Sequence, residues 1–272
     1  MPLIEANGAQ IHITDTGNPP GVPDAPVVVF GHGLLFSGHM FRAQIDRLRP
    51  SYRCVTIDWR GQGKSPATAD GYDMETLFED AAAVIDGLGV GAVHYVGLSM
   101  GGFVGQRLAS RRPELIRSLS LLDTSAGPED PDKVSQYRLL AAIYRWVGMN
   151  PLEGKVKPLM FGPTYLADPS SKSGIEEFKA VLRAADRVGI KKAIRGVTDR
   201  LPVVDELPSI STPTLVVVGE DDVATPVAKA EKIVAGIKGA TLKLVPNCGH
   251  SSTVEQPDAL ADLLEEFLNA QP

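Results

Sequence analysis

The stretch that decides the fold is the ten-residue segment 93–102, VHYVGLSMGG. An apolar run suited to a buried strand comes first, then the pattern G-x-S-x-G centred on Ser99, and then a helical stretch. A sharp strand-to-helix turn of this kind holds the serine in a strained backbone and lifts its hydroxyl above the edge of the sheet. Side chains two residues before and after it would collide, so the turn needs Gly97 and Gly101. Outside this setting, the same pattern describes an ordinary glycine-rich turn that contains a serine.

Working outward from this turn, short apolar runs alternate with helical patterns, which is typical of βαβ units. Several runs are continuously apolar, as expected of strands covered on both faces. We therefore predict an α/β fold with a mainly parallel twisted sheet flanked by helices. The predicted strands are 10–15, 27–30, 53–57, 93–97, 118–122, 214–218 and 241–245, and apolar repeats predict helices over 74–88 and 260–268. Two helix starts are also predicted, with Thr225 as a cap before Pro226 and with Gln256 before Pro257.

One long segment breaks the alternation. Between residues 127 and 207 there is no convincing strand, only helical patterns over 134–147, 175–188 and 190–199 that glycine and proline interrupt. We interpret 127–207 as a helical cap inserted between two strands, with 1–126 and 208–272 as the two parts of one core. A cap over the carboxyl ends of parallel strands lies where open α/β sheets place their ligand crevice.

The composition excludes several classes of function. The chain has 272 residues, 27 Lys and Arg against 33 Asp and Glu, and a net charge of −6, which is not the charge of a nucleic-acid or lipid-surface binder. Its apolar runs are too short to cross a membrane, and its start lacks the pattern of a signal peptide. Cys54 and Cys248 match no common zinc spacing and are too few for a disulfide framework. We expect a cytoplasmic protein with a small-molecule partner and no cofactor; the sequence leaves its oligomeric state open.

A serine hydroxyl needs a base, and His250 is the best candidate of the 5 histidines. It follows the last predicted strand on a loop before the final helix, which is the chain order that this architecture uses. His12 and His94 lie in predicted strands, where a packed histidine is the simpler interpretation. His32 and His39 belong to the loop after an early strand, and we expect His32 to brace that loop. An exposed loop position is the alternative for His250.

The base in turn needs an acid that fixes its tautomer. Asp222 is the preferred candidate because it follows a strand, in the right chain order, shortly before a helix start. Its neighbours Glu220 and Asp221 compete with it, and it could simply cap that helix. Asp123 is a rival because it too ends a predicted strand.

An ester-cleaving serine also needs amides that stabilise an oxyanion. The amide of Met100 lies at a helix start, and the glycine-rich loop after residue 30 supplies Leu34 as the second predicted donor. Apolar side chains of the cap predict a pocket with no Lys or Arg cluster, although at least half of them could form the core of the cap itself. These side chains are Tyr144, Trp146, Met149, Met160, Phe161 and Tyr165. Of these, Trp146, Met160 and Phe161, together with Leu35, are the predicted pocket residues.

Together these features resemble the α/β-hydrolase superfamily over essentially the whole chain. The matching pieces are His32-Gly33, the segment 58–65 (DWRGQGKS), the turn around Ser99, the acid turn at Asp222, and Gly249-His250 followed by 255–257 (EQP). Within the superfamily the chain is similar to single-cap esterases and lactonases, such as 3-oxoadipate enol-lactonases and serine-type N-acyl-homoserine lactonases.

This resemblance implies Ser99 as nucleophile, Asp222 as acid, His250 as base, and the amides of Leu34 and Met100 as oxyanion donors. Serine in the turn argues against dehalogenases and epoxide hydrolases of this fold, which use aspartate there, and Leu98 argues against the carbon–carbon bond hydrolases. The clustered histidines of zinc lactonases are missing, so the expected reaction is metal-independent. We expect ester or lactone hydrolysis, with an acyl-homoserine lactone as substrate and hence quorum quenching as a role. A general carboxylesterase or perhydrolase, or a receptor-like ligand-binding module on the same fold, remains the alternative.

Overall fold

The computed structural model describes residues 3–271, and its centre is an eight-stranded sheet with the order β1-β2-β4-β3-β5-β6-β7-β8. The strands are β1 Leu3–Ala6, β2 Ala9–Asp15, β3 Val27–Gly31, β4 Arg53–Asp58, β5 Val93–Leu98, β6 Ile116–Leu122, β7 Thr214–Gly219 and β8 Thr241–Val245. All neighbours from β4 to β8 pair in parallel, whereas β2 runs antiparallel to β1 and to β4. The predicted α/β class with a mainly parallel sheet is confirmed.

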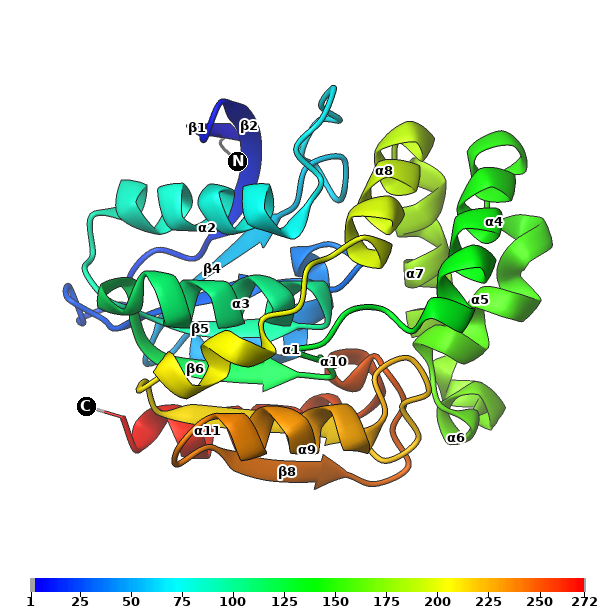
Figure 1. The fold of residues 1–272 in the computed structure, drawn as a ribbon. Helices are drawn as coiled ribbons and strands as arrows, with labels where there is room; N and C mark the ends of the chain where they lie inside the picture. Colours follow the sequence, from blue (N-terminus) through cyan, green and yellow to red (C-terminus); the bar gives the residue numbers. More distant parts are fainter. Residues whose placement is uncertain (1–2, 272) are drawn as a thin grey trace.

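Helices cover both faces of this sheet and one end of it (Figure 1). Their bounds are α1 Arg42–Leu48, α2 Met74–Leu88, α3 Met100–Arg111, α4 Pro131–Val147, α5 Glu153–Met160, α6 Pro163–Ala167, α7 Lys172–Ala184, α8 Arg187–Thr198, α9 Val227–Gly236, α10 Ser252–Glu255 and α11 Pro257–Asn269. Helices α2, α3 and α9 contribute to one hydrophobic cluster, and α1 and α11 to the other. Among residues 3–271, every helix is too short or too polar to cross a bilayer.

Every residue of β3 is buried, and its side chains pack alternately on the two faces of the sheet. Val27 and Val29 belong to the cluster with α2 and α3, while Val28 and Phe30 belong to the cluster with α1 and α11. Successive side chains of a strand point to opposite faces, so a strand covered on both sides must be apolar at every position. The same rule applies to the apolar run of β7.

Helices α4 to α8 connect β6 to β7 and lie beyond the carboxyl ends of the parallel strands (Figure 1). Their apolar side chains, including Leu140, Phe178 and Leu182, join the cluster that contains α1 and α11. These helices therefore share a hydrophobic core with the sheet instead of forming a separate body. In the following, "cap" denotes residues 127–207, the segment that contains helices α4 to α8.

The model corrects several predicted element bounds. Strand β1 was not predicted, although the Asn7-Gly8 dipeptide before β2 is a strong hairpin signal, and both residues have positive φ, 48° and 71°. The helix predicted over 175–188 ends at Ala184, because the side chain of Asp186 accepts a hydrogen bond from the amide of Gly189 and starts α8. Helix α4 starts earlier than predicted, at Pro131, and α5 and α6 were not predicted.

Candidate active site

Ser99 lies in the turn between β5 and α3 with φ 49° and ψ −108°. Residues other than glycine rarely adopt this backbone conformation. The close packing around it explains the glycines on either side. A Cβ atom on Gly97 would lie 2.4 Å from the carbonyl oxygen of Gly101, and one on Gly101 would lie 1.9 Å from that of Gly31. The amide of Ser99 donates to the carbonyl of Leu122 at 2.8 Å, which fixes the turn against the end of β6. The expected collision at both glycine positions is confirmed.

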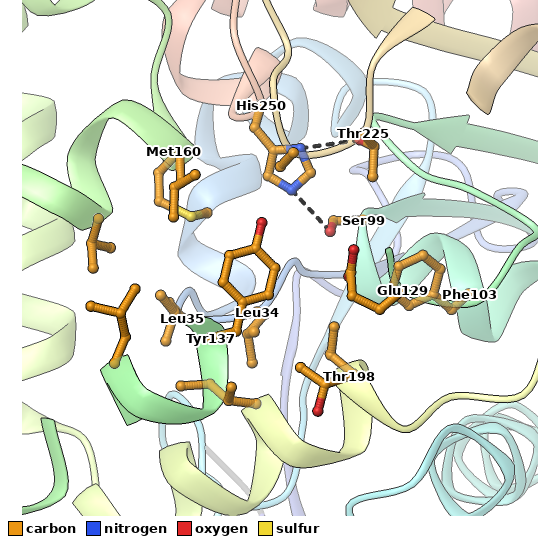
Figure 2. A pocket seen from close by; sticks show the side chains of 16 residues that line it. Leu34, Leu35, Ser99, Phe103, Glu129, Tyr137, Met160, Thr198, Thr225 and His250 are labelled. Atoms are coloured by element: carbon orange, nitrogen blue, oxygen red, sulfur yellow. Dashed lines mark hydrogen bonds between the residues drawn. The ribbon is translucent and has the colours of Figure 1, made fainter. Parts of the chain in front are cut away.

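His250 reaches Ser99 from the loop after β8. The distance between His250 Nε2 and Ser99 Oγ is 3.0 Å, and His250 Nδ1 lies 2.9 Å from Asp222 Oδ2 (Figure 2 draws the first of these contacts). A carboxylate only accepts, so Nδ1 carries the proton and Nε2 is left as an acceptor for the serine O–H. Three residues that are far apart in the sequence are thus joined in one hydrogen-bonded chain.

Asp222 is held by the loop that precedes α9. Its Oδ1 accepts from the amides of Ala224 and Thr225 at 2.8 and 2.9 Å, and its Oδ2 accepts from the Thr225 hydroxyl at 2.7 Å. Burial alone would raise the pKa of Asp222, but the charge of His250 and the hydrogen bonds from His250 and Thr225 lower it below its ordinary value. Thr225 was predicted to cap α9; instead Pro226 occupies the N-cap position and Thr225 orients the acid.

The environment of His250 favours its protonated form. Burial by itself would lower the pKa of His250, but the adjacent Asp222 carboxylate raises it above the ordinary value. The loop is also fixed from behind, because the Glu255 carboxylate accepts from the amides of Gly249 at 2.9 Å and Ser251 at 3.0 Å. Glu255 further accepts from Gly162 at 2.8 Å, which ties the histidine loop to the cap.

Asp123, the rival acid, lies at the end of β6 without contacting His250. Its carboxyl accepts from the amides of Gly219 at 3.0 Å and Ser252 at 3.4 Å. Burial, together with the nearby Asp222, raises the pKa of Asp123 to about 8. At neutral pH this group is therefore largely protonated, which is the opposite of what an acid that stabilises an imidazolium requires.

The two amides that were predicted as oxyanion donors belong to the loop after β3 and to the start of α3. Leu34 belongs to the turn after β3 and lines the same cavity as Ser99, and Met100 is the first residue of α3. Within residues 3–271, neither amide has a hydrogen-bond acceptor. His32 braces the first of these turns, as expected: its Nε2 accepts from the amide of Trp59 at 3.1 Å.

A cavity of about 120 Å³ opens in front of Ser99 and His250, between the strand ends and the cap (Figure 2). Its lining is mostly apolar and comes from the core loops, α3, α4, α5 and α8. The lining residues are Leu34, Leu35, Ser99, Phe103, Glu129, Tyr137, Leu140, Val156, Leu159, Met160, Ile194, Val197, Thr198, Ala224, Thr225 and His250. Among residues 3–271, no three His, Cys, Asp or Glu side chains are grouped so that they could hold a metal ion.

Of the four predicted pocket residues, Leu35 and Met160 line this cavity and the other two do not. Trp146 is 78 % exposed, because it lies on the outer face of α4, where Arg145 stacks on its ring. Phe161 is buried among aromatic rings, 5.4 Å from Phe178 and 5.3 Å from Tyr165 between centroids. The prediction is wrong for Trp146 and Phe161.

Tyr137 and Glu129 are among the lining residues that the sequence analysis missed. Tyr137 precedes Leu140 by three positions, so the helical repeat of α4 could have placed both on the inner face. Figure 2 shows its ring reaching into the cavity with the hydroxyl toward His250. Glu129 carries no such signal, because it lies in an irregular segment between β6 and α4.

The chain belongs to the alpha/beta hydrolase family, whose model matches residues 28–263, and it is therefore a hydrolase. It is 27% identical to 3-oxoadipate enol-lactonase 2 of Acinetobacter baylyi, over 91% of this chain and 90% of that protein. It is 25% identical to a proposed carbamate hydrolase, RutD, of Stutzerimonas stutzeri, over 92% and 94% of the two chains. It is also similar to the solved structure of Est816, described as an N-acyl homoserine lactone degrading enzyme, at 25% identity and a TM-score of 0.82 over 98% and 100% of the two chains.

Proposed function

We propose that this hydrolase cleaves carboxylic esters or lactones by a metal-independent serine mechanism with an acyl-enzyme intermediate, and that its substrate is a lactone of the N-acyl-homoserine type. The observation that carries the proposal is the hydrogen-bonded chain Ser99–His250–Asp222 at the floor of a mostly apolar cavity. The similarity to enol-lactonase and homoserine-lactone-degrading proteins supports the ester and lactone classes.

In the first half of the reaction, Ser99 Oγ attacks the carbonyl carbon while His250 Nε2 takes its proton. The 3.0 Å separation of these two atoms allows the transfer without rearrangement. Negative charge then develops on the former carbonyl oxygen, and the amides of Leu34 and Met100 stabilise it. Asp222 stabilises the imidazolium, and the fixed Nδ1 proton keeps Nε2 in the correct tautomer.

In the second half, His250 donates its proton to the leaving alkoxide and then activates a water molecule that hydrolyses the acyl-enzyme. A lactone places a special demand on this step, because its leaving alcohol stays tethered and favours ring closure. Water must therefore reach the acyl-enzyme before the alcohol attacks again.

Residues 127–207 act, in this proposal, as a cap that selects the substrate. Side chains from α4, α5 and α8, such as Leu140, Met160 and Ile194, form the wall that faces the reacting serine. Their apolar character favours an acyl chain because its burial removes apolar surface from water.

A substrate panel tests the reaction class. Turnover of acyl-homoserine lactones with acyl chains of different length should be compared with that of 4-nitrophenyl esters, in the presence and absence of EDTA. We expect cleavage of lactones and esters that survives EDTA. Cleavage of esters alone would reduce the proposal to a general carboxylesterase.

Active-site labelling separates an enzyme from a binding module on the same fold. A fluorophosphonate probe should react with the wild type and leave the Ser99→Ala variant unlabelled, since Ser99 is the proposed nucleophile. An unlabelled wild type without a burst on an activated ester would favour a binding function and contradict the proposed mechanism.

A further inference from the structure

A single carboxylate, that of Glu129, lies in the wall of the otherwise apolar cavity. Of the lining residues in the described part of the chain, it is the only carboxylic acid, and no lysine or arginine accompanies it. The side chain of Glu129 is 8 % exposed. In Figure 2 its carboxyl points into the cavity near Ser99.

This carboxylate is held in place by a network that leaves its charge at the cavity surface. Glu129 Oε1 accepts from the amide of Asp130 at 3.0 Å, and Oε2 accepts from Arg200 Nη1 at 2.9 Å. The Arg200 guanidinium lies behind the wall, 4.3 Å from the centroid of the Phe103 ring, and does not line the cavity. A carboxylate has about four acceptor positions, so Glu129 retains acceptor capacity toward a ligand.

The elements around the cavity bring a second carboxylate near it, but no lysine or arginine side chain into its lining. The Asp222 carboxylate lies directly behind His250. Lys229 approaches Glu129 only at 3.9 Å and is likewise absent from the cavity lining. A ligand in the cavity therefore meets the negative end of the Glu129–Arg200 pair, and in a partly dry site such a charge acts more strongly than in water.

We propose that Glu129 is a specificity-determining residue that excludes substrates with a negatively charged acyl group, so that the substrate class is neutral esters and lactones. The inference rests on the proposed function, because it assigns a selectivity to that same cavity. A carboxylate on the acyl group would lose its hydration and face Glu129 without a lysine or arginine to pair with. A neutral acyl chain carries no such penalty.

This selectivity separates the two kinds of lactone that the relatives suggest. 3-Oxoadipate is a dicarboxylic acid, so its enol-lactone keeps one free carboxylate. An N-acyl-homoserine lactone with a simple alkyl chain carries no charge. The Glu129 wall favours the second kind, although the chain is similar to an enol-lactonase over most of its length.

A pair of matched esters tests the inference. One is the 4-nitrophenyl monoester of adipic acid, and the other is the same compound with its free carboxylate converted to a methyl ester. For the wild type we expect kcat/KM, corrected for spontaneous hydrolysis, to be about 100-fold higher for the methyl ester. In Glu129→Gln this ratio should fall about tenfold, which corresponds to about 1.4 kcal/mol.

Asp130→Asn provides the matched control. Asp130 is the neighbouring acid, pairs with Lys229 at 3.1 Å, and does not line the cavity, so this variant should keep the wild-type ratio within about threefold. Equal kcat/KM for the two esters in the wild type would overturn the inference, whether or not Glu129→Gln folds. An equal fall of the ratio in both variants would also contradict it, because the discrimination would then come from net charge.

Failure of the proposed function would be recognised separately. It would appear as no cleavage of either ester and no labelling of Ser99. In that case the selectivity is tested by measuring the binding of two uncleaved amides by calorimetry. One is adipamate, the monoamide of adipic acid with a free carboxylate, and the other is its neutral methyl ester. Tighter binding of the methyl ester supports the Glu129 wall, and equal binding refutes it.

Discussion

The two walls of the cavity are held in place by different kinds of interaction. The wall formed by the strand ends is fixed by directed hydrogen bonds, such as those that Asp222 accepts from Thr225 and His250. The wall formed by the cap is fixed mainly by apolar packing, as at Leu140 and Met160. Hydrogen bonds define positions to within tenths of an ångström, whereas apolar contacts tolerate changes of shape. In our proposal the first wall performs the reaction and the second selects what reacts.

The largest expected effects belong to the strand-end wall. Ser99→Ala and His250→Ala should each lower kcat for ester hydrolysis by about a million-fold, because a nucleophile and its base act as one unit. Thermal unfolding should change little, since both side chains line the cavity and are not part of either hydrophobic cluster. A rate of hydrolysis near that of the wild type in either variant would contradict the serine mechanism.

The two buried aspartates of the strand-end wall, Asp222 and Asp123, should differ in their effect on activity. Asp222→Asn should lower kcat by about ten-thousand-fold, because the amide cannot fix the active tautomer of His250. Asp123→Asn should cost no more than about tenfold, because Asp123 is already largely uncharged at neutral pH. The reverse order of the two variants would mean that Asp123 is the acid.

The pH dependence of activity tests the same wall. Only neutral His250 can accept the serine proton, so kcat/KM should rise with pH through the pKa of His250 and fall about tenfold per pH unit below it. Since Asp222 raises that pKa, the midpoint should lie above 6.5 in the wild type and shift to lower pH in Asp222→Asn. A midpoint that stays in place would show that Asp222 does not act on His250.

Two methionines of the cap test whether a residue that lines the cavity and a residue that only stabilises the fold have different effects on substitution. Met160 lines the cavity, so Met160→Ala should lower kcat/KM for a hexanoyl ester relative to an acetyl ester by about tenfold. Met149 is buried in the same hydrophobic cluster but does not line the cavity. Met149→Ala should therefore lower the free energy of unfolding by about 2–5 kcal/mol and leave the ratio of the two esters unchanged. Equal ratios in the two variants would contradict the assigned lining.

The smallest effect is expected on the outer face of the cap. Trp146 is exposed and away from the cavity, so Trp146→Ala should change the free energy of unfolding by less than about 0.5 kcal/mol. Denaturant unfolding and the kinetics of the same two esters provide the measurement. A change in ester selectivity would show that the cap can bring this face to the substrate.

The strands and the strand-to-helix turn could be predicted because their signals are local. β5 and α3 follow from an apolar run, the spacing of glycines around Ser99 and a helical repeat, all within about twenty residues. β1 was missed although its signal, Asn7-Gly8, is equally local. The cap was harder, because amphipathic helices show which residues are apolar but not against which neighbour each one packs.

The candidate pocket shows where this local information ends. Trp146 and Met160 are both large apolar residues of the cap, yet one faces outward and the other lines the cavity. The rotation of each helix about its axis decides this, and that rotation depends on packing against the rest of the fold. Glu129 could not be found at all, because its placement depends on Arg200, which lies at the far end of the cap sequence.

The sequence by itself determined the parallel sheet, the turn around Ser99 and the candidates for base and acid, because chain order and residue spacing limit what each strand end can present. Only the tertiary structure distinguished Asp222 from Asp123 as the partner of His250, since both follow strands and their separation from the imidazole is a matter of three-dimensional packing. It alone also brought Glu129 to the cavity wall and turned Trp146 away from it. The sequence gives the chemical type of each side chain. Which groups surround that side chain, and therefore what it can do, depends on contacts between segments that are distant in the chain.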